Sequence, residues 1–162
     1  AVEDHRFEQH FGIDPIAIGR AAWNNLTSWS LREGGSTITQ QLAKNMYFTQ
    51  EKSFIRKIAE MFMAFRLENA YTKDNILELY VNSIYFGDGY YCVRDASQGY
   101  FGKEPIDMTG YESTLLAGIP NAPSVYSLTA NPDFAKQRQQ YVIQQMVRYG
   151  YISEDEGKEL SQ

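Results

Sequence analysis

The sequence predicts an all-α protein, for three reasons. Helix-start signals recur along the chain, including boxes in which a Ser or Thr precedes a Gln or Glu by three residues. Apolar residues between these signals recur every three or four positions, which is the period of a helix. No stretch alternates apolar and polar residues convincingly, as a half-buried strand would. With 162 residues and 43% hydrophobic content, the chain is expected to form one globular domain over residues 1–162.

Most expected helices begin at a capping residue or a proline, and several end at a glycine or before a proline. In chain order the helices run from Asp14-Pro15 toward Trp29, from Thr37 or Ile38 onward, from Ser53 to about Tyr71, from Thr72 to near Gly87, from Val93 to Tyr100, from Thr109 to before Pro120, from Asn131-Pro132 to Gly150, and from Ser153 onward. Residues 120–131 are rich in Pro, Asn and Ser and are expected to form an ordered loop.

The stretch Gly34–Asn45 joins a double glycine to a helix start. Thr37 and Gln40 have the spacing of a capping box. On the helix that follows, Gln40 and Lys44 lie on one face, and hydroxyls and amides such as Ser36 and Gln41 surround them in sequence. A glycine turn that leads into a helix start of this kind suits an anionic, hydroxyl-rich ligand such as a sugar phosphate.

Two carboxylates, Glu3 and Glu60, are candidates for sugar chemistry, which commonly needs one group to move a proton and another to organise charge. Glu60 lies away from the apolar stripe of its helix, which consists of Phe54, Ile58, Met61, Phe62 and Phe65. Helix geometry alone favours an exposed ion pair of Glu60 with Arg56, because charged runs usually mark solvated faces. Glu3 alone is an ordinary acidic residue near a chain start.

Four basic residues gather within a short part of an otherwise acidic chain. They are Lys44, Lys52, Arg56 and Lys57. Such a cluster suits the electrostatic stabilisation of a phosphate or pyrophosphate, although scattered surface lysines give the same pattern. The net charge of −5 argues against a general nucleic-acid binder, which needs a basic face.

Other residues carry weaker signals. A single cysteine, Cys92, excludes an internal disulfide and is expected to be a small packed residue. The absence of metal-binding motifs predicts no metal site. A structural hydrogen bond is a more common role than catalysis for a residue such as His10. Trp23 and Leu26, with Trp29 and Leu31, suit either a membrane interface or ordinary core packing.

Five motifs follow one another along almost the whole chain. They are Glu3-Asp4-x-x-Phe7-x-x-His10-x-Gly12-x-Asp14, Gly34-Gly35-Ser36-Thr37-Ile38-Thr39-Gln40-Gln41-Leu42-x-Lys44-Asn45, Arg56-Lys57-x-x-Glu60, Lys73-x-x-Ile76-Leu77-Glu78-x-Tyr80-x-Asn82, and Leu116-Ala117-Gly118-x-Pro120-x-x-Pro123-x-x-Tyr126. In this order they resemble the peptidoglycan glycosyltransferase (transglycosylase) domain of class A penicillin-binding proteins and of monofunctional peptidoglycan glycosyltransferases. The resemblance reverses the interpretation of Glu60, from a surface residue to a catalytic one.

The resemblance implies a lysozyme-like helical fold with a smaller, membrane-facing lobe. It implies an enzyme, a hexosyltransferase, that polymerises lipid II, a disaccharide-pentapeptide on undecaprenyl pyrophosphate, into glycan strands by inverting β-1,4 transfer. Glu3 is then the general base that takes the proton from the acceptor 4-hydroxyl, and Glu60 assists it. The groups implied to bind substrate oxygens and pyrophosphate are Ser36, Gln40, Gln41, Lys44, Lys52, Arg56 and Lys57.

The resemblance also implies partners and a location. The expected partners are lipid II, the growing glycan chain, a membrane surface and moenomycin-type inhibitors, with no nucleic acid. The expected location is the outer face of the bacterial cytoplasmic membrane, with an anchor upstream of this chain. No cofactor is required, although the family leaves room for a divalent cation such as Mg²⁺ or Mn²⁺. Two departures from the family pattern are Lys52, where relatives often have Arg, and residues 92–95.

Two alternatives stay open on the sequence. The first is a lysozyme-like lytic enzyme that cleaves finished peptidoglycan, and the second is a lipid II-binding module without turnover. The basic cluster disfavours the first, because a hydrolase of neutral linkages has no pyrophosphate to neutralise. The presence of both Glu3 and Glu60 disfavours the second.

Overall fold

The computed structural model describes residues 1–28, 34–49 and 53–162. Over these residues the regular structure is entirely helical, as expected. The elements are η1 (Phe7–Gln9), α1 (Pro15–Ser28), α2 (Ile38–Tyr47), α3 (Phe54–Ala70), α4 (Lys73–Val81), α5 (Val93–Phe101), η2 (Pro105–Asp107), α6 (Gly110–Gly118), η3 (Ile119–Asn121), α7 (Pro132–Arg148) and α8 (Glu154–Leu160). None of the described helices combines the length and the apolar character needed to cross a bilayer.

The chain forms two compact units, which we call unit 1 and unit 2. Unit 1 consists of Ala1–His5 and Val81–Gln162, and unit 2 consists of Arg6–Tyr80. Unit 1 is therefore built from both ends of the chain, with unit 2 inserted between them. The single domain over residues 1–162 stays a prediction.

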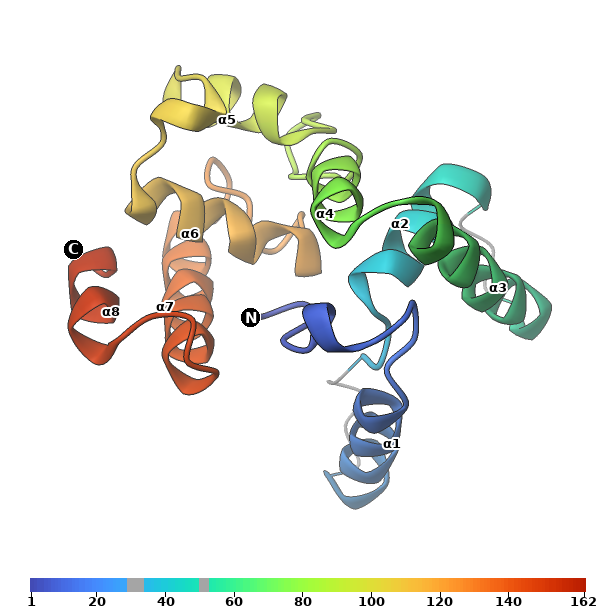
Figure 1. Ribbon diagram of the computed structural model, residues 1–162. Coiled ribbons are helices and arrows are strands. Elements are labelled where there is room, and N and C mark those ends of the chain that lie inside the picture. The colour runs from blue at the N-terminus through green and yellow to red at the C-terminus, as the bar shows by residue number, and fades with distance from the viewer. Residues whose placement is uncertain (29–33, 50–52) are drawn as a thin grey trace. The chain divides into compact units, whose positions relative to one another are not determined.

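Unit 1 is a helical cluster in which α6 packs against α7 and α8 contacts both (Figure 1). Its core includes Leu115, Leu116, Ile119, Ala135, Val142 and Ile143. In unit 2, α2 packs against α3 (Figure 1). The core of this unit is formed by Phe7, Leu42, Ala43, Ala64, Leu67, Ile76 and Tyr80.

The expected capping boxes are confirmed at the starts of α2, α6 and α8. In each box the side chain of the N-cap residue accepts the backbone N–H of the residue three positions later. The side chain of that later residue accepts the backbone N–H of the N-cap residue in return. Ser53 likewise caps α3, and the Asp14 carboxylate accepts the N–H groups of Ile16 and Ala17 at the start of α1. These helix starts are therefore fixed by local side-chain hydrogen bonds, whereas the Asn131 side chain makes no such bond at the start of α7.

Two elements differ from expectation. Helix α4 ends at Val81 and not near Gly87, because residues 82–92 form turns that include a backbone hydrogen bond from Phe86 to Tyr90. The apolar stripe of α3 points outward, with Phe54 80% and Phe62 67% exposed.

The buried face of α3 consists instead of Glu60, Ala64 and Leu67. Gly12 explains part of this choice, since it has a φ of +90° and a Cβ there would lie 3.0 Å from the carbonyl carbon of Ala64. A backbone segment therefore lies directly on α3 at the small side chain of Ala64. The larger residues of the apolar stripe occupy the other face.

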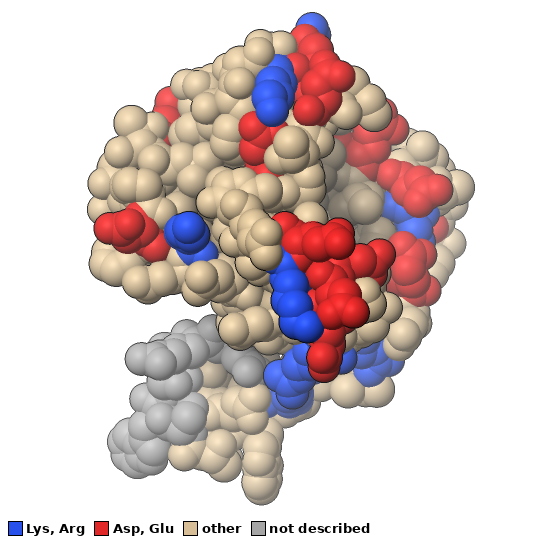
Figure 2. Space-filling view, turned by 90° about the vertical axis from the view of Figure 1, so that its left-hand side faces the viewer, with Lys and Arg blue, Asp and Glu red and all other residues tan. Residues whose placement is uncertain are grey.

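Figure 2 shows how charged side chains are distributed over one face of the molecule. On the face that Figure 2 shows, basic side chains lie beside acidic ones. This pattern accords with the net charge of −5. On α1, Trp23 and Leu26 are exposed and do not pack in the core, whereas Trp29 and Leu31 lie outside the described residues.

Candidate active site

At the start of α2, Thr37 and Gln40 each accept the backbone N–H of the other with their side chains. The Thr37 hydroxyl accepts the N–H of Gln40 and donates to the Gly12 carbonyl at 2.6 Å. The Gln40 side-chain oxygen accepts the N–H of Thr37 at 3.0 Å, and the whole residue is buried. Gln40 therefore shapes the turn that carries Ser36.

The next polar residues of α2 are more accessible. Gln41 is half-buried, and its side-chain oxygen accepts the Tyr80 hydroxyl at 3.1 Å. Lys44 is also half-buried and makes no ion pair with any carboxylate of the described residues.

Glu60 lies at the centre of a cluster that joins α3 to the residue before the α2 cap. Its side chain is only 2% exposed. Arg56 Nε lies 2.8 Å from Glu60 Oε1, and Lys57 Nζ lies 3.2 Å from Oε2. Lys57 also donates a hydrogen bond of 2.6 Å to Ser36 Oγ. The expected Glu60–Arg56 pair is present, but it is buried and not exposed.

This arrangement can bind anions. Two cations face one carboxylate, so the cluster keeps an excess of positive charge beside a serine hydroxyl. Lys57 remains 42% exposed along its side chain and can reach a ligand from solvent. Lys52, the remaining member of the predicted basic set, lies outside the described residues.

A second buried charge supports the same helices and was not anticipated from the sequence. Glu68 accepts hydrogen bonds from Thr39 Oγ1 at 2.7 Å and from Lys73 Nζ at 2.8 Å. Lys73 also donates to the His10 carbonyl, and His10 Nδ1 accepts the N–H of Gly12. His10 therefore makes the structural hydrogen bond expected for it. The signal for Glu68 was its spacing, because it follows Glu60 by two turns on the buried face of α3.

Glu3 belongs to unit 1, where the C-terminal half of the chain holds it. Arg138 Nη2 on α7 lies 3.7 Å from Glu3 Oε1, and both side chains are mostly buried. Two residues further on, His5 stacks on Tyr149 with a centroid distance of 4.0 Å, and its carbonyl accepts the Tyr151 hydroxyl at 3.0 Å. Sequence reasoning missed Arg138, which no local signal connects to Glu3.

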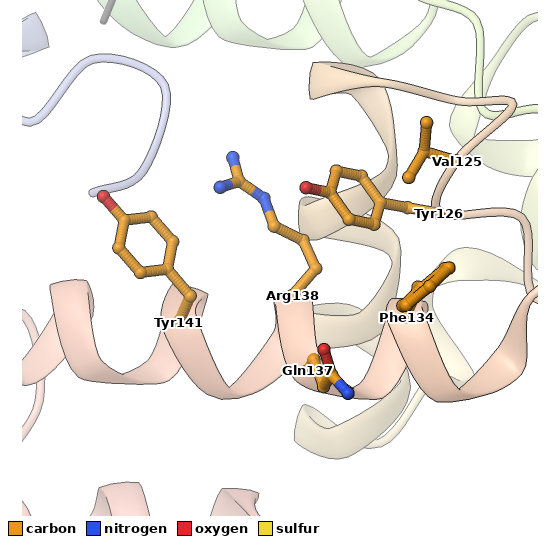
Figure 3. Close-up of a pocket in the computed structure, with 6 residues that line it drawn as sticks. All are labelled: Val125, Tyr126, Phe134, Gln137, Arg138 and Tyr141. Carbon is orange, nitrogen blue, oxygen red and sulfur yellow. The ribbon is translucent and has the colours of Figure 1, made fainter. Parts of the chain in front are cut away.

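A cavity of about 390 Å³ lies beside Arg138 in unit 1. Its lining consists of Val125, Tyr126, Phe134, Gln137, Arg138 and Tyr141 (Figure 3). The Arg138 guanidinium lies between the rings of Tyr126 and Tyr141 (Figure 3), at 5.5 Å and 5.0 Å from their centroids. The cavity is lined by aromatic rings with one amide and one cation.

The described residues include potential metal ligands and the single thiol, that of Cys92. Within residues 1–28, 34–49 and 53–162, no group of three His, Cys, Asp or Glu side chains is arranged to hold a metal ion. Cys92 is half-buried, and its sulfur accepts the N–H of Asp95 at the start of α5. It therefore serves as a helix cap.

Comparison with known proteins places these residues in a family. The family described as Transglycosylase matches residues 1–147. The chain belongs to this family. Penicillin-binding protein 1F of Bacillus subtilis is 48% identical over 96% of the chain, and a Cupriavidus necator protein with a transglycosylase name is 47% identical over 96%.

The transglycosylase chain matches only part of some relatives. It spans 22% of the Bacillus subtilis protein and 67% of the Cupriavidus necator protein. A crystal structure of penicillin-binding protein 1A from Haemophilus influenzae matches with a TM-score of 0.53 and 30% identity, over 77% of this chain and 15% of that one. The all-helical fold is therefore that of the transglycosylase family.

Proposed function

We propose that this chain polymerises lipid II into glycan strands in bacterial cell-wall synthesis. The observation that supports this function best is the Glu60 cluster, in which Lys57 bridges Ser36 and a buried carboxylate. Its excess positive charge suits a pyrophosphate leaving group, which a hydrolase of neutral linkages does not need. Membership of the transglycosylase family adds independent support.

In the proposed reaction Glu3 is the general base. Its carboxylate takes the proton from the acceptor 4-hydroxyl while that oxygen attacks C1 of the donor sugar. The bond from C1 to the pyrophosphate oxygen breaks, and the electron pair leaves with undecaprenyl pyrophosphate. Attack from the opposite face converts the α-linkage into a β-1,4 bond.

Glu60 acts in this scheme through the cations it holds. Arg56 and Lys57 are fixed by the buried carboxylate, so they neutralise developing charge on the pyrophosphate without first reorganising. Lys44 and Lys52 add further positive charge. The side chains of Ser36 and Gln41 bind sugar and phosphate oxygens, and Gln40 shapes the turn that presents them.

The lipid substrate implies a membrane surface as partner. Exposed apolar side chains in unit 2 support this part of the proposal, since Trp23 and Leu26 on α1 and Phe54 and Phe62 on α3 suit an interface with lipid. We place the reaction on the outer face of the cytoplasmic membrane.

The growing glycan chain is the second substrate, and moenomycin-type inhibitors are expected to compete at the pyrophosphate site. No cofactor is proposed, and a divalent cation would assist only at the pyrophosphate.

The decisive experiment measures glycan polymers formed from lipid II by this chain in detergent. We expect the unaltered chain to make glycan polymer. The variant Glu3→Gln is expected to bind lipid II but to form no polymer. Glu8→Gln, which changes an exposed glutamate, serves as the matched control. Shortening of finished glycan would instead indicate a lytic enzyme. Retention of lipid II without product by the unaltered chain would indicate a binding module.

A second experiment tests the contact with pyrophosphate. Lys44→Ala is expected to lose more activity on lipid II than on a soluble sugar acceptor, because only lipid II presents the pyrophosphate. Lys158→Ala removes an exposed lysine of α8 and is the control. Equal losses on both substrates would contradict a pyrophosphate contact at Lys44.

A further inference from the structure

We propose that Arg138 is a positioning residue that orients the carboxylate of Glu3 for proton transfer. The inference rests on the proposed function, because Arg138 has this task only if Glu3 is the general base. It adds to that function a residue from α7, at the other end of the chain. Three features of unit 1 support it.

The first feature is the geometry of the ion pair. At 3.7 Å, the contact between Arg138 Nη2 and Glu3 Oε1 is longer than a hydrogen bond. The guanidinium therefore attracts the carboxylate without donating a hydrogen bond to it across this contact. A bidentate arginine would occupy both carboxylate oxygens and reduce their basicity. The observed spacing brings a positive charge beside Glu3 without forming such a bidentate pair.

The second feature is the support around Arg138 itself. Its guanidinium is flanked by the rings of Tyr126 and Tyr141 (Figure 3), which come from the loop after η3 and from α7. Its stem passes over Gly118 on α6, where a Cβ would lie 2.9 Å from Arg138 Cγ. Three neighbours from different elements therefore restrict the side chain. An arginine that served only to solubilise the surface would not need such support.

The third feature is that different residues contact the backbone and the carboxylate of the Glu3 segment. The main chain is held two residues away, by the stacking of His5 on Tyr149 and by the hydrogen bond from Tyr151. These contacts fix the backbone but do not reach the Glu3 carboxylate. Arg138 supplies a contact to the carboxylate itself. Loss of Arg138 should therefore remove one contact of the carboxylate while the segment stays docked.

The test compares steady-state kinetics of lipid II polymerisation for Arg138→Met, Arg138→Lys and the control Lys136→Met. Methionine keeps an unbranched stem over Gly118 but removes the charge. We expect Arg138→Met to lower kcat by about 10- to 100-fold, the range that a misplaced catalytic group produces, with KM changed by less than about threefold. Lys136, an exposed cation of the same helix, should be replaceable without effect.

Arg138→Lys decides between a positioning role and a purely structural one. Lysine restores the positive charge, so we expect it to recover part of the lost kcat at an unchanged melting temperature. Equal kcat values for the lysine and methionine variants would overturn the proposal, and so would a lysine variant that keeps the melting temperature of the unaltered chain but recovers none of its kcat. A raised KM with unchanged kcat would also overturn it, because Arg138 would then bind substrate directly.

The two proposals fail in different ways. If the unaltered chain makes no polymer, the proposed function fails, and the role of Arg138 falls with it. If the unaltered chain makes polymer and Arg138→Met matches its kcat, only the role of Arg138 fails.

Discussion

Glu60 illustrates how burial changes the meaning of an ion pair. A surface pair such as Arg94 with Glu104 contributes little, because water solvates both partners when they separate. Glu60 is enclosed by α3 and its neighbours and depends on Arg56 and Lys57 for its charge to be tolerated. Removing one partner of a buried ion pair leaves a charge that is neither paired nor fully hydrated, and this lowers the stability of the fold.

We predict that Glu60→Ala lowers the free energy of unfolding by about 2 kcal/mol, somewhat less than for a fully enclosed pair, because Lys57 reaches solvent. Urea denaturation at neutral pH measures this change. Glu104→Ala is the matched control and should shift the midpoint only slightly. Equal shifts for the two variants would contradict the structural role of the buried charge.

The same residue marks a limit of sequence reasoning. Helix spacing alone placed Arg56 and Lys57 within reach of Glu60, and the structure confirms both contacts. Spacing could not say which face of α3 is buried, because that choice depends on α2 and on the Gly12 backbone that lies against Ala64. The larger apolar side chains, which dominate a periodicity argument, are on the exposed face.

Asp88 provides a residue whose effect depends on pH. It sits in the left-handed region, with a φ of 51°, and accepts hydrogen bonds from Thr129 and Ser127. The hydrogen bond from Thr129, with that from Ser127, holds the pKa of Asp88 below its ordinary value of 3.8. A carboxylate of this kind stabilises the fold above its unfolded pKa, and the contribution is lost as the pH falls through the folded pKa.

We therefore predict that Asp88→Asn lowers stability near neutral pH and that the difference from the unaltered chain narrows below about pH 4. Asparagine is the suitable replacement, since it tolerates a positive φ. Urea midpoints measured between pH 6 and pH 3 provide the comparison. A difference that stays constant over this range would show that the charge of Asp88 is not what stabilises the loop.

At the scale of elements, the helix starts contribute unequally. Thr37 and Ser153 both head capping boxes, but only Thr37 also donates to a distant carbonyl, that of Gly12. Replacing Thr37 therefore removes a cap and leaves a buried carbonyl without this donor. The box at Ser153 is exposed, and water can replace the lost hydrogen bonds.

We predict a loss of about 1 kcal/mol for Ser153→Ala and about 2 kcal/mol for Thr37→Ala. Chemical denaturation of the two variants measures the difference. If Thr37→Ala costs no more than Ser153→Ala, the bond to Gly12 adds nothing to the stability of the fold.

Local sequence signals predicted where most helices begin. The end of α4 and the contact between Arg138 and Glu3 depend on residues outside such local signals. The starts of α2, α3, α6 and α8 were readable because each cap lies within four residues of its helix. The end of α4 at Val81 was not, because turns that follow it determine where the helix stops. Likewise, Arg138 reaches Glu3 across almost the whole sequence, and no spacing rule connects them.

The whole molecule is organised by the insertion of unit 2 into unit 1. Residues 1–5 are joined to the rest of unit 1, which begins at Val81, through the chain of about 75 residues that forms unit 2. When that chain is disordered, closing it as a loop costs about 4 kcal/mol of entropy. The docking of Glu3 therefore depends on a folded unit 2, which favours the behaviour of a single domain.

We accordingly predict one cooperative unfolding transition. Both tryptophans, Trp23 and Trp29, lie in the range of unit 2, so tryptophan fluorescence monitors that unit, whereas far-UV circular dichroism monitors helices of both. The two probes should give the same urea midpoint. Separate midpoints would mean that the two units unfold independently and that residues 1–162 do not act as one domain.

The pairing of the two ends of unit 1 also orders events in time. The contact between His5 and Tyr151 joins positions 146 residues apart, so it belongs to the contacts of highest sequence separation in the chain. During synthesis at about 5 to 20 residues per second, the segment that carries Glu3 emerges before α7 and Tyr151 and waits roughly 7 to 30 seconds for them. A ribosome-bound intermediate can thus complete the Glu60 cluster before Arg138 reaches Glu3. The proposed general base is made before its partner on α7, and we expect it to reach its native place late in folding.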